Sequence, residues 1–386
     1  MKRVSVFGST GFIGQKSVQI LRSNPNDFEV EALVANSNVQ LLALQAKSLN
    51  AKMVVTADDS HYGELKSCLQ GTGIKVAAGL SGVLEASSFN VDSAIMAITG
   101  MASLAPVMEL VKTGVGTIAL ASKESMVCGG ALLVEAARAK GVHMVPVDSE
   151  HNAVFRVLSS RSDPESITIT ASGGPFLHWT KEQMERASLD DALIHPVWKM
   201  GRKISVDSAT MVNKALEVIE ASYLFALGHD KINVVVHPES IIHGFASYSD
   251  GVSMALMSVP DMSIPILYAL YWPDSGGIYN GAIDLASYGE LTFMQPDMER
   301  FPALRSGFDI LKSPKSHAAG VVFNAANEVA VCSFLKSEIK FLDIVNIILC
   351  VMDKISYDRV NSLGDIIEYD SLSRSIAEEV ISTLVS

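Results

Sequence analysis

The stretch VSVFGSTGFIG, residues 4–14, decides the fold. An apolar run ends at Phe7, and Gly8, Gly11 and Gly14 follow before helix-forming sequence begins. Glycines in a turn between a strand and a helix let a pyrophosphate approach the backbone, and the free amides of the helix bind its charge. The spacing is GxxGxxG rather than GxGxxG, so a turn needed only for packing is the alternative. The stretch predicts a dinucleotide-binding turn.

Short apolar runs alternate with helix-period segments from this turn to about Val147. The runs that we expect to be strands are residues 4–7, 30–35, 53–56, 94–98, 117–121 and 143–147. This alternation is typical of βαβ units with a parallel sheet. Ligands of such sheets gather at the edge where the strands end.

The pattern of apolar and polar residues changes after Val147. Expected strands at 166–170, 234–236, 242–247 and 252–258, the last two joined by a turn at 248–251, indicate an α+β region. Prolines and glycines then suggest a connector to about residue 300, and helix-period sequence follows, clearest at 318–335 and 341–352. The fold class is α/β, with an N-terminal Rossmann-like parallel sheet, a central α+β domain and a C-terminal helical domain. The predicted division is 1–147, 148–272, a linker at 273–300, and 301–386.

Composition narrows the classes of function. The chain has 386 residues, 48% of them apolar, and a net charge of -12, which would repel a nucleic-acid backbone. The longest uncharged stretch, 93–108, is too short and too polar to span a membrane. The 4 cysteines fit neither a disulfide framework nor a CxxC metal site, and no export signal is seen. We expect a cytoplasmic protein that binds neither nucleic acid nor membrane.

The end of the second strand bears on cofactor preference. An NAD site usually carries an acidic residue there, whereas this chain has Ala35, Asn36, Ser37 and Asn38. Neutral donors accept a 2′-phosphate, which favours NADP, although no Arg or Lys is present to clamp it.

Acidic residues follow the strand at 143–147. Asp148 and Glu150 are two residues apart, so in extended backbone both carboxylates point the same way and can hold a hard cation such as Mg²⁺ or Mn²⁺. A third carboxylate, Glu217, lies in a helix predicted to begin near Ser208, on one face with Asn213, Lys214 and Glu220. The alternatives are a solvated acidic loop and a surface helix with a routine Lys-Glu pair.

Two loops complete the candidate site. The sequence TASGGP at 170–175 follows a strand and could form a backbone nest for an anion, or an ordinary turn. The loop at 194–203, with His195 and Trp198, could close over a ligand. Alternatively, it is a connection in which Trp198 fills a core gap and His195 is structural.

Taken together, these residues resemble one family, 1-deoxy-D-xylulose 5-phosphate reductoisomerase. The blocks that carry the resemblance are GSTGFIG at 8, ALASKES at 119, PVDSEH at 146, ASGGPF at 171, HPVWKMGRKISVDSATMVNKALEVIEA at 195, VHPESIIHG at 236 and NAANEVAV at 324. The resemblance spans essentially the whole chain. It implies a homodimer with an N-terminal NADPH-binding domain, a central catalytic and dimerisation domain with a mobile loop at 194–203, a linker and a helical C-terminal domain.

The resemblance also implies roles for residues. The implied ligands of Mg²⁺ or Mn²⁺ are Asp148, Glu150 and Glu217. The implied contacts to a sugar phosphate substrate are Lys123, Ser149, Glu150, Ser172, His195, Trp198, Ser208, Asn213, Lys214 and Glu217, with Met200 in the closing loop. The implied NADPH contacts are Thr10, Gly11, Phe12, Ile13, Asn36, Ser37, Asn38, Ser122, Glu124 and Gly201. Lys123, Glu150 and His195 are the candidate catalytic residues.

Departures from the family pattern lie at the cofactor end and in the loop. Asn36 and Ser37 stand where members commonly have Gly-Lys or Gly-Arg, and Ser122 replaces a usual Asn. Val197 and Lys199 stand where Asn and Ser are frequent. None of these changes touches the three carboxylates.

The implied reaction isomerises 1-deoxy-D-xylulose 5-phosphate to a branched aldehyde and reduces it to 2-C-methyl-D-erythritol 4-phosphate. A retro-aldol and aldol sequence and a concerted carbon shift need the same residues, so both routes stay open. Two other classes are kept: an NADP-dependent oxidoreductase that needs no metal, and a non-catalytic nucleotide sensor.

Overall fold

The computed structural model describes residues 1–274, 276–279, 281–313 and 315–385. The chain divides into two compact units, each with its own sheet. The first unit consists of Met1–Ser125, Leu133–Asn152 and Asp261–Asn280, and the second of Met126–Leu132, Ala153–Pro260 and Gly281–Ser386.

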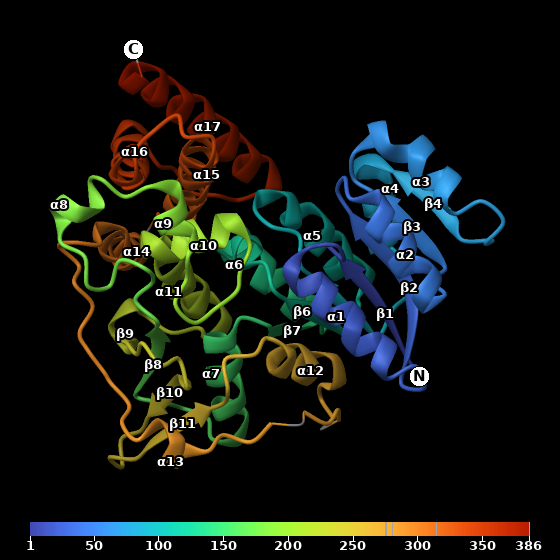
Figure 1. Ribbon diagram of the computed structural model, residues 1–386, viewed down its shortest axis with the longest axis horizontal. Coiled ribbons are helices and arrows are strands. Elements are labelled where there is room, and N and C mark those ends of the chain that lie inside the picture. Colours follow the sequence, from blue (N-terminus) through green and yellow to red (C-terminus); the bar gives the residue numbers. More distant parts are fainter. Residues whose placement is uncertain (275, 280, 314, 386) are drawn as a thin grey trace. The chain divides into compact units, whose positions relative to one another are not determined.

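A parallel sheet of 7 strands, in the order β4-β3-β2-β1-β5-β6-β7, forms the first unit (Figure 1). The strands are β1 Lys2–Phe7, β2 Phe28–Ala35, β3 Met53–Thr56, β4 Lys75–Ala78, β5 Ser93–Met96, β6 Thr117–Leu120 and β7 His143–Pro146. The chain builds outward from β1 to β4 and then returns to β5 on the other side of β1. In open parallel sheets, ligands bind beyond the carboxyl ends of the strands at such a reversal of strand order, which here lies between β1 and β5. The predicted α/β class and N-terminal parallel sheet are confirmed.

Strand β4 carries no strand signal in the sequence. Its four residues, KVAA, are exposed or half-buried rather than apolar throughout, because the strand lies at the edge of the sheet. An edge strand needs less apolar surface than a central one, so its pattern is weak.

Helices α1 to α6 lie between the strands of the first unit, and α7 follows the last of these strands. They are α1 Phe12–Ser23, α2 Val39–Leu49, α3 Tyr62–Cys68, α4 Gly79–Ser87, α5 Leu104–Thr113, α6 Lys123–Lys140 and α7 Ser149–Ser160, with short 3₁₀ turns η1 Asp59–His61 and η2 Met101–Ser103. Helices α6 and α7 each contribute residues to both units.

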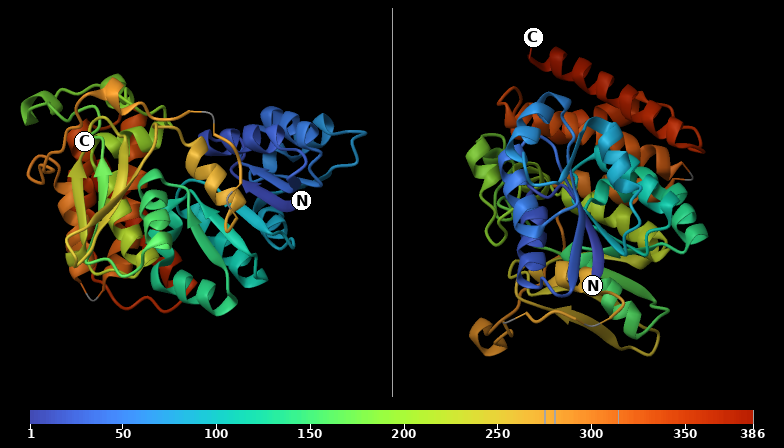
Figure 2. Two further views of the ribbon diagram at one scale, coloured as in Figure 1. Left: turned by 90° about the horizontal axis from the view of Figure 1, so that it is seen from below. Right: turned by 90° about the vertical axis from the view of Figure 1, so that its right-hand side faces the viewer.

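A late segment of the chain completes the first unit. Helix α12, Ser263–Tyr271, packs against α1, β6 and β7 (Figure 2). The Lys2 ammonium donates to the carbonyls of Tyr271 at 2.8 Å and Trp272 at 2.7 Å, and so caps the carboxyl end of α12. At the other end, Lys16 Nζ lies 2.9 Å from Asp261 Oδ1.

This helix differs from the connector expected in the sequence. Pro265 lies in its first turn, where the missing N–H of proline costs no hydrogen bond, so a proline that reads as a breaker is compatible with the helix. Asp261–Asn280 clusters with the first unit, whereas the sequence-based division assigns 261–272 to the central domain and 273–280 to the linker. The functional division into four parts stays a prediction.

The second unit contains a mixed sheet of 4 strands in the order β11-β10-β8-β9. The strands are β8 Ser166–Ala171, β9 Ile232–Val236, β10 Ile242–Ser247 and β11 Ser253–Met257. Strands β10 and β11 form the predicted hairpin: Tyr248 N donates to Val252 O at 2.9 Å, and Gly251 adopts a φ of +83° in the turn. The predicted central α+β region is therefore confirmed.

Helices make up the rest of the second unit. They are α8 Lys181–Met184, α9 Leu189–Leu193, α10 Arg202–Ala209, α11 Val212–Phe225, α13 Leu285–Tyr288, α14 Pro302–Lys312, α15 Ser316–Leu335, α16 Phe341–Lys354 and α17 Leu363–Val385, with the 3₁₀ turn η3 His229–Lys231. The two helices predicted most clearly, at 318–335 and 341–352, are α15 and α16.

The single helix predicted to begin near Ser208 is wrong. The structure has α10 up to Ala209 and α11 from Val212, because Met211 takes a left-handed φ of +60°. A methionine carries no sequence signal for this conformation, since glycine and asparagine are the residues that usually adopt it.

Helix α15 is the one helix in the described part of the chain that is long and apolar enough to cross a membrane. Of its most apolar window, 72% is buried inside the protein. It packs against α16 and α17, and its Val322, Phe323 and Ala326 are 0% exposed. Its apolar character is therefore accounted for by the core of the second unit.

The contacts of α12 generate a prediction about acid stability. Burial opposes the ionised form of Asp261, but hydrogen bonds from the Ser263 amide and from Lys16 outweigh burial and lower the pKa of its carboxyl from 3.8 to about 2. The stabilisation is therefore complete above about pH 4 and is lost as the pH falls toward about 2. We expect Asp261→Asn to lower the free energy of unfolding by about 0.5–1 kcal/mol at pH 6, a value reduced by solvent screening, and by less at pH 3.

Urea unfolding at the two pH values measures this difference. Asp59→Asn, at an exposed position of the same unit, is the matched control. An equal loss of stability at both pH values for Asp261→Asn would contradict the account.

Candidate active site

The turn after β1 is shaped by two glycines. Gly8 has a φ of +86°, and a Cβ there would lie 2.4 Å from the carbonyl oxygen of Ala97. A Cβ on Gly14 would lie 2.1 Å from the carbonyl oxygen of Gly8, in the first turn of α1. Neither position has room for a side chain, which brings the backbone of the turn close to β5 and to the start of the helix. Gly8 and Gly14 are therefore required for packing within the protein, and the approach of a pyrophosphate to this turn stays a prediction.

The start of α1 fits a pyrophosphate. The helix begins after Gly11, which has no side chain to cap the first amides, so these donors are open to an anion. Of the predicted cofactor contacts, Thr10 and Gly11 lie in the turn before α1, and Phe12 and Ile13 lie in the first turn of α1. The Ser9 hydroxyl beside them is buried and makes no hydrogen bond within the described residues.

The predicted ribose contacts lie on one loop after β2. Asn36 and Ser37 are exposed, whereas Asn38 accepts a hydrogen bond from Leu41 N at 3.2 Å and is the N-cap of α2. Capping occupies the side-chain oxygen of Asn38 and leaves its amide nitrogen as the group available to a ligand.

The strand ends at β6 and β7 bring four of the predicted residues together. Lys123, at the start of α6, places its Nζ 2.6 Å from Asp148 Oδ2. Ser149 donates a hydrogen bond to Glu150 Oε2 at 2.6 Å. Lys123 is only 8% exposed. Because little water screens the two charges, the attraction between the Lys123 ammonium and the Asp148 carboxylate is stronger than at the protein surface.

In the second unit, the loop after β8 meets the predicted mobile loop. His195 Nε2 lies 2.8 Å from Ser172 Oγ, and Gly174 N donates to the same oxygen at 3.3 Å. His195 Nδ1 accepts hydrogen bonds from the backbone amides of Val197 at 3.1 Å and Trp198 at 2.9 Å. The histidine therefore joins the loop at 194–203 to the loop of Ser172.

These contacts determine the state of the imidazole. Because Nδ1 accepts from two amides, the neutral ring carries its proton on Nε2 and donates to Ser172. Burial lowers the pKa of His195 from 6.5 to about 4, so the ring is neutral at pH 7. Ser172 then accepts from both His195 and Gly174, and its own proton is left to donate to an anion.

Helix α11 carries a polar face that is buried rather than exposed. Lys214, Glu217 and Glu220 are 4%, 1% and 1% exposed. The Lys214 ammonium pairs with Glu217 and also donates to the carbonyl of Thr170 at the end of β8, while Asn213 donates to the other oxygen of Glu217. The alternative of a solvent-facing Lys-Glu pair is therefore wrong.

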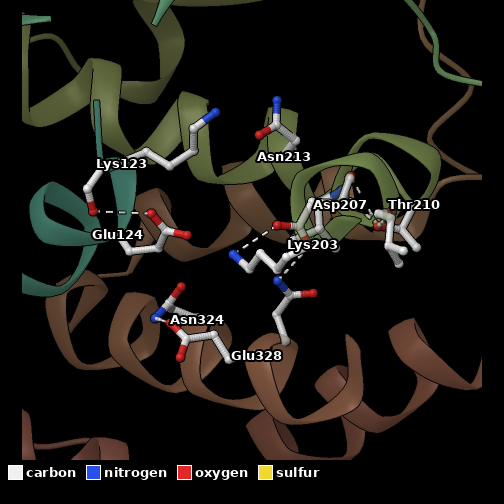
Figure 3. A network of polar contacts seen from close by, with 12 residues as sticks. Lys123, Glu124, Lys203, Asp207, Thr210, Asn213, Asn324 and Glu328 are labelled. Atoms are coloured by element: carbon white, nitrogen blue, oxygen red, sulfur yellow. Dashed lines mark hydrogen bonds and ion pairs between the residues drawn. The ribbon is translucent and has the colours of Figure 1, made fainter. Parts of the chain in front are cut away.

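A second buried network, which the sequence does not predict, supports α10. Asp207 pairs with Lys203 Nζ at 2.9 Å (Figure 3). It also accepts a hydrogen bond from Asn327 Nδ2 of α15 at 2.8 Å. Asp207 is 1% exposed and precedes Ser208, a predicted phosphate contact. The signal in the sequence is the NAANEVAV block, whose two asparagines interrupt an apolar helix.

The rest of the loop at 194–203 lies between α9 and α10. Ile194 is 70% exposed, the ring of Trp198 lies 6.1 Å from the ring of His243, and Gly201 is the N-cap of α10. Trp198 thus contacts a side chain of β10. That the loop closes over a ligand stays a prediction.

The fold and these residues define a class: a nucleotide-dependent oxidoreductase that also offers anion-binding donors and buried carboxylates. Models of a known family match the chain along most of its length. They are described as 1-deoxy-D-xylulose 5-phosphate reductoisomerase over residues 4–130, its C-terminal domain over 144–225, and DXP reductoisomerase C-terminal domain over 257–376. The chain belongs to the 1-deoxy-D-xylulose 5-phosphate reductoisomerase family.

Individual relatives agree with this assignment. The chain is 65% identical over 382 residues to 1-deoxy-D-xylulose 5-phosphate reductoisomerase of Anaplasma phagocytophilum strain HZ, with 99% of each chain covered. It is 51% identical to that of Ehrlichia ruminantium strain Gardel, with 100% of each covered.

Solved structures of the family share the fold. The enzyme from Zymomonas mobilis in complex with NADPH is 39% identical, with a TM-score of 0.91 and coverage of 98% of this chain and 99% of that one. A DOX-P reductoisomerase in complex with NADPH, fosmidomycin and magnesium is 34% identical, with a TM-score of 0.92 and coverage of 100% and 99%.

The geometry around His195 predicts its titration. We expect a pKa near 4 because the ring is buried, and the Nε2-protonated neutral form at pH 7 because Nδ1 accepts from two backbone amides. As the pH falls from 6.5 toward 4, His195 binds a proton in the unfolded chain but not in the folded chain. The contribution of His195 to the free energy of unfolding is therefore lost over that range. Long-range ¹H–¹⁵N correlation spectra of histidine-labelled protein measure both the tautomer and the pKa.

His195→Gln identifies the signal in these spectra. An Nδ1-protonated ring, or a midpoint near 6.5, would show that the loop hydrogen bonds do not hold the imidazole.

The contact between α10 and α15 predicts a loss of stability. Asn327→Ala removes a donor from the buried Asp207 carboxylate, so we expect the free energy of unfolding to fall by about 1–3 kcal/mol. Chemical denaturation measures the change, with the exposed Asn346→Ala on α16 as control. If the two variants are equally stable, Asp207 does not depend on Asn327.

Proposed function

We propose that this chain converts 1-deoxy-D-xylulose 5-phosphate to 2-C-methyl-D-erythritol 4-phosphate by isomerisation and reduction, with NADPH and Mg²⁺ or Mn²⁺ as cofactors. The reaction supplies isoprenoid precursors by the non-mevalonate pathway. The observation that carries the proposal is the buried pair of Lys214 and Glu217, with the half-buried Asn213 bonded to Glu217, because such charges are costly to bury and are kept where they act on a ligand. Family membership over the full chain supports the same reaction.

Asp148, Glu150 and Glu217 are the proposed metal ligands. All are carboxylates, the donors that Mg²⁺ and Mn²⁺ prefer. A cation held by these residues would supply Lewis-acid chemistry at the oxygens of the hydroxyketone. Asn213 and Lys214 hold the carboxylate of Glu217 in place, and Ser149 holds that of Glu150, so the donors are fixed before any ligand arrives.

The substrate phosphate is proposed to bind Ser172, Ser208, Asn213 and Lys214, with His195 beside them. The neutral ring of His195 aims the free hydroxyl proton of Ser172 outward, as a donor suited to a phosphate oxygen. Remote binding of the phosphate supplies the energy that orients the reacting carbons and closes the loop of Trp198 and Met200.

The cofactor is proposed to lie along the ends of the first sheet. Thr10 to Ile13 receive the pyrophosphate, Asn36 to Asn38 the 2′-phosphate, and Ser122, Glu124 and Gly201 the remainder. NADPH supplies the hydride, and the protein supplies position and exclusion of water. Lys123, with its ammonium beside Asp148, and Glu150 are the candidates for moving protons near the reacting oxygens.

A homodimer in the cytoplasm is part of this proposal. Strand β11 is at an edge of the second sheet, and Met254, Leu256 and Met257 on it are half-buried. An edge strand with partly exposed apolar side chains favours pairing with a second copy of the chain.

The test is oxidation of NADPH with 1-deoxy-D-xylulose 5-phosphate, with and without Mn²⁺. We expect turnover that chelation abolishes and Mn²⁺ restores. Asp148→Asn and Glu217→Gln should each lower kcat by about two orders of magnitude or more, because a bound Lewis acid contributes several kcal/mol. The affinity for NADPH, measured by fluorescence, should change less than about twofold, since that cofactor occupies its own site.

Glu378→Gln, an exposed change on α17, is the matched control. Turnover that survives chelation would favour a reductase that needs no metal. Binding of NADPH without turnover, unchanged in Asp148→Asn, would favour a nucleotide sensor.

A further inference from the structure

Three buried serine hydroxyls gather at the end of β6 in the first unit. Ser103, Ser122 and Ser125 are 0%, 2% and 0% exposed. Ser103 Oγ lies 2.7 Å from Ser122 Oγ and 2.6 Å from Ser125 Oγ. Ser122 is the N-cap residue of α6, at the edge of the sheet where the dinucleotide is expected.

The proton positions in this cluster follow from its acceptors. Ser103 donates to the carbonyl oxygen of Gly100 at 2.6 Å, and that oxygen can only accept. Each hydroxyl has one proton, so Ser103 has none left and must accept from both neighbours. Ser125 and Ser122 therefore both donate to Ser103. The proton of Ser122 then points toward Ser103, and the Ser122 oxygen, which also lies 3.2 Å from Ser125 Oγ, is left as an acceptor.

We propose that Ser103 is a positioning residue for the cofactor: it takes the proton of Ser122 so that the Ser122 oxygen accepts a hydrogen bond from the carboxamide N–H of the nicotinamide. This inference rests on the proposed function, in which Ser122 contacts NADPH. The carboxamide nitrogen is a donor, and a serine whose proton is already used is a matched acceptor for it.

The pair accounts for a departure from the family pattern. Asparagine is usual at the position of Ser122. The side-chain carbonyl of asparagine is an acceptor whose direction is fixed by the amide group to which it belongs. A serine hydroxyl rotates freely unless a neighbour fixes it, and at 2.7 Å Ser103 does so. Without Ser103, the acceptors left near the Ser122 hydroxyl among the described contacts are Ser125 Oγ, at 3.2 Å, and Glu124 Oε2, at 3.3 Å. Turning the proton to Glu124 would rotate the lone pairs away.

The test compares two dinucleotides by fluorescence titration of the full chain. One is NADPH, and the other is its reduced 3-acetylpyridine analogue, in which a methyl group replaces the carboxamide NH₂. We expect the unmodified protein to bind NADPH about three- to tenfold more tightly than the analogue, the worth of one hydrogen bond. Ser122→Ala should bind both equally, and Ser103→Ala should reduce the preference to less than about twofold.

The double variant Ser103→Ala with Ser122→Ala separates positioning from packing. If Ser103 acts through Ser122, adding Ser103→Ala to Ser122→Ala leaves the ratio of the two affinities unchanged. Ser93→Ala is the control, because its hydroxyl is buried in the same unit with no hydrogen-bond partner within the described residues.

A preference that survives in both Ser122→Ala and Ser103→Ala would overturn the inference while leaving NADPH binding, and so the proposed function, intact. Absence of NADPH binding to the unmodified protein would overturn both.

Discussion

The burial of charge on α11 is the constraint on which the second unit depends. Lys214 and Glu217 are almost fully withdrawn from water, so each must be paired, and the Lys214 ammonium must find a further acceptor. It finds the carbonyl of Thr170, which holds α11 against the end of β8. A buried ion pair often adds little to stability compared with apolar residues of the same size. The presence of this ion pair in the core is therefore better explained by a role in function than by a contribution to stability.

The break at Met211 follows from the same arrangement. One continuous helix would place Ser208 and Asn213 five positions apart on a single cylinder. Instead, α10 ends and α11 begins on either side of the left-handed Met211, so the carboxyl end of α10 lies close to the amino end of α11. Gly174 packs against this junction, where a Cβ would lie 2.8 Å from the carbonyl oxygen of Ser208. The glycines after Ser172 thus let one loop approach the end of α10 closely.

The sequence predicts those parts of the site in which the residue type alone determines what the position can do. Gly8 and Gly14 are readable because no other residue fits, and Asp148 and Glu150 are readable because hard cations need carboxylates. The roles of Asp207, Asn327 and Ser103 are not readable, since each depends on a partner far away in the chain. The edge strand β4 and helix α12 are missed because their local patterns are weak or resemble a connector. The left-handed Met211 has no local cause at all and is set by packing.

The first unit is discontinuous in the chain, and this has a consequence for how the protein is made. Its sheet is complete once residue 146 has been synthesised, yet α12 follows more than a hundred residues later. Until then, Lys2 lacks the carbonyls of Tyr271 and Trp272, and Lys16 lacks Asp261. The nascent sheet therefore emerges from the ribosome with the surface of α1, β6 and β7 that α12 later covers still open to solvent. The first unit is completed only after the part of the second unit up to Pro260 has been translated.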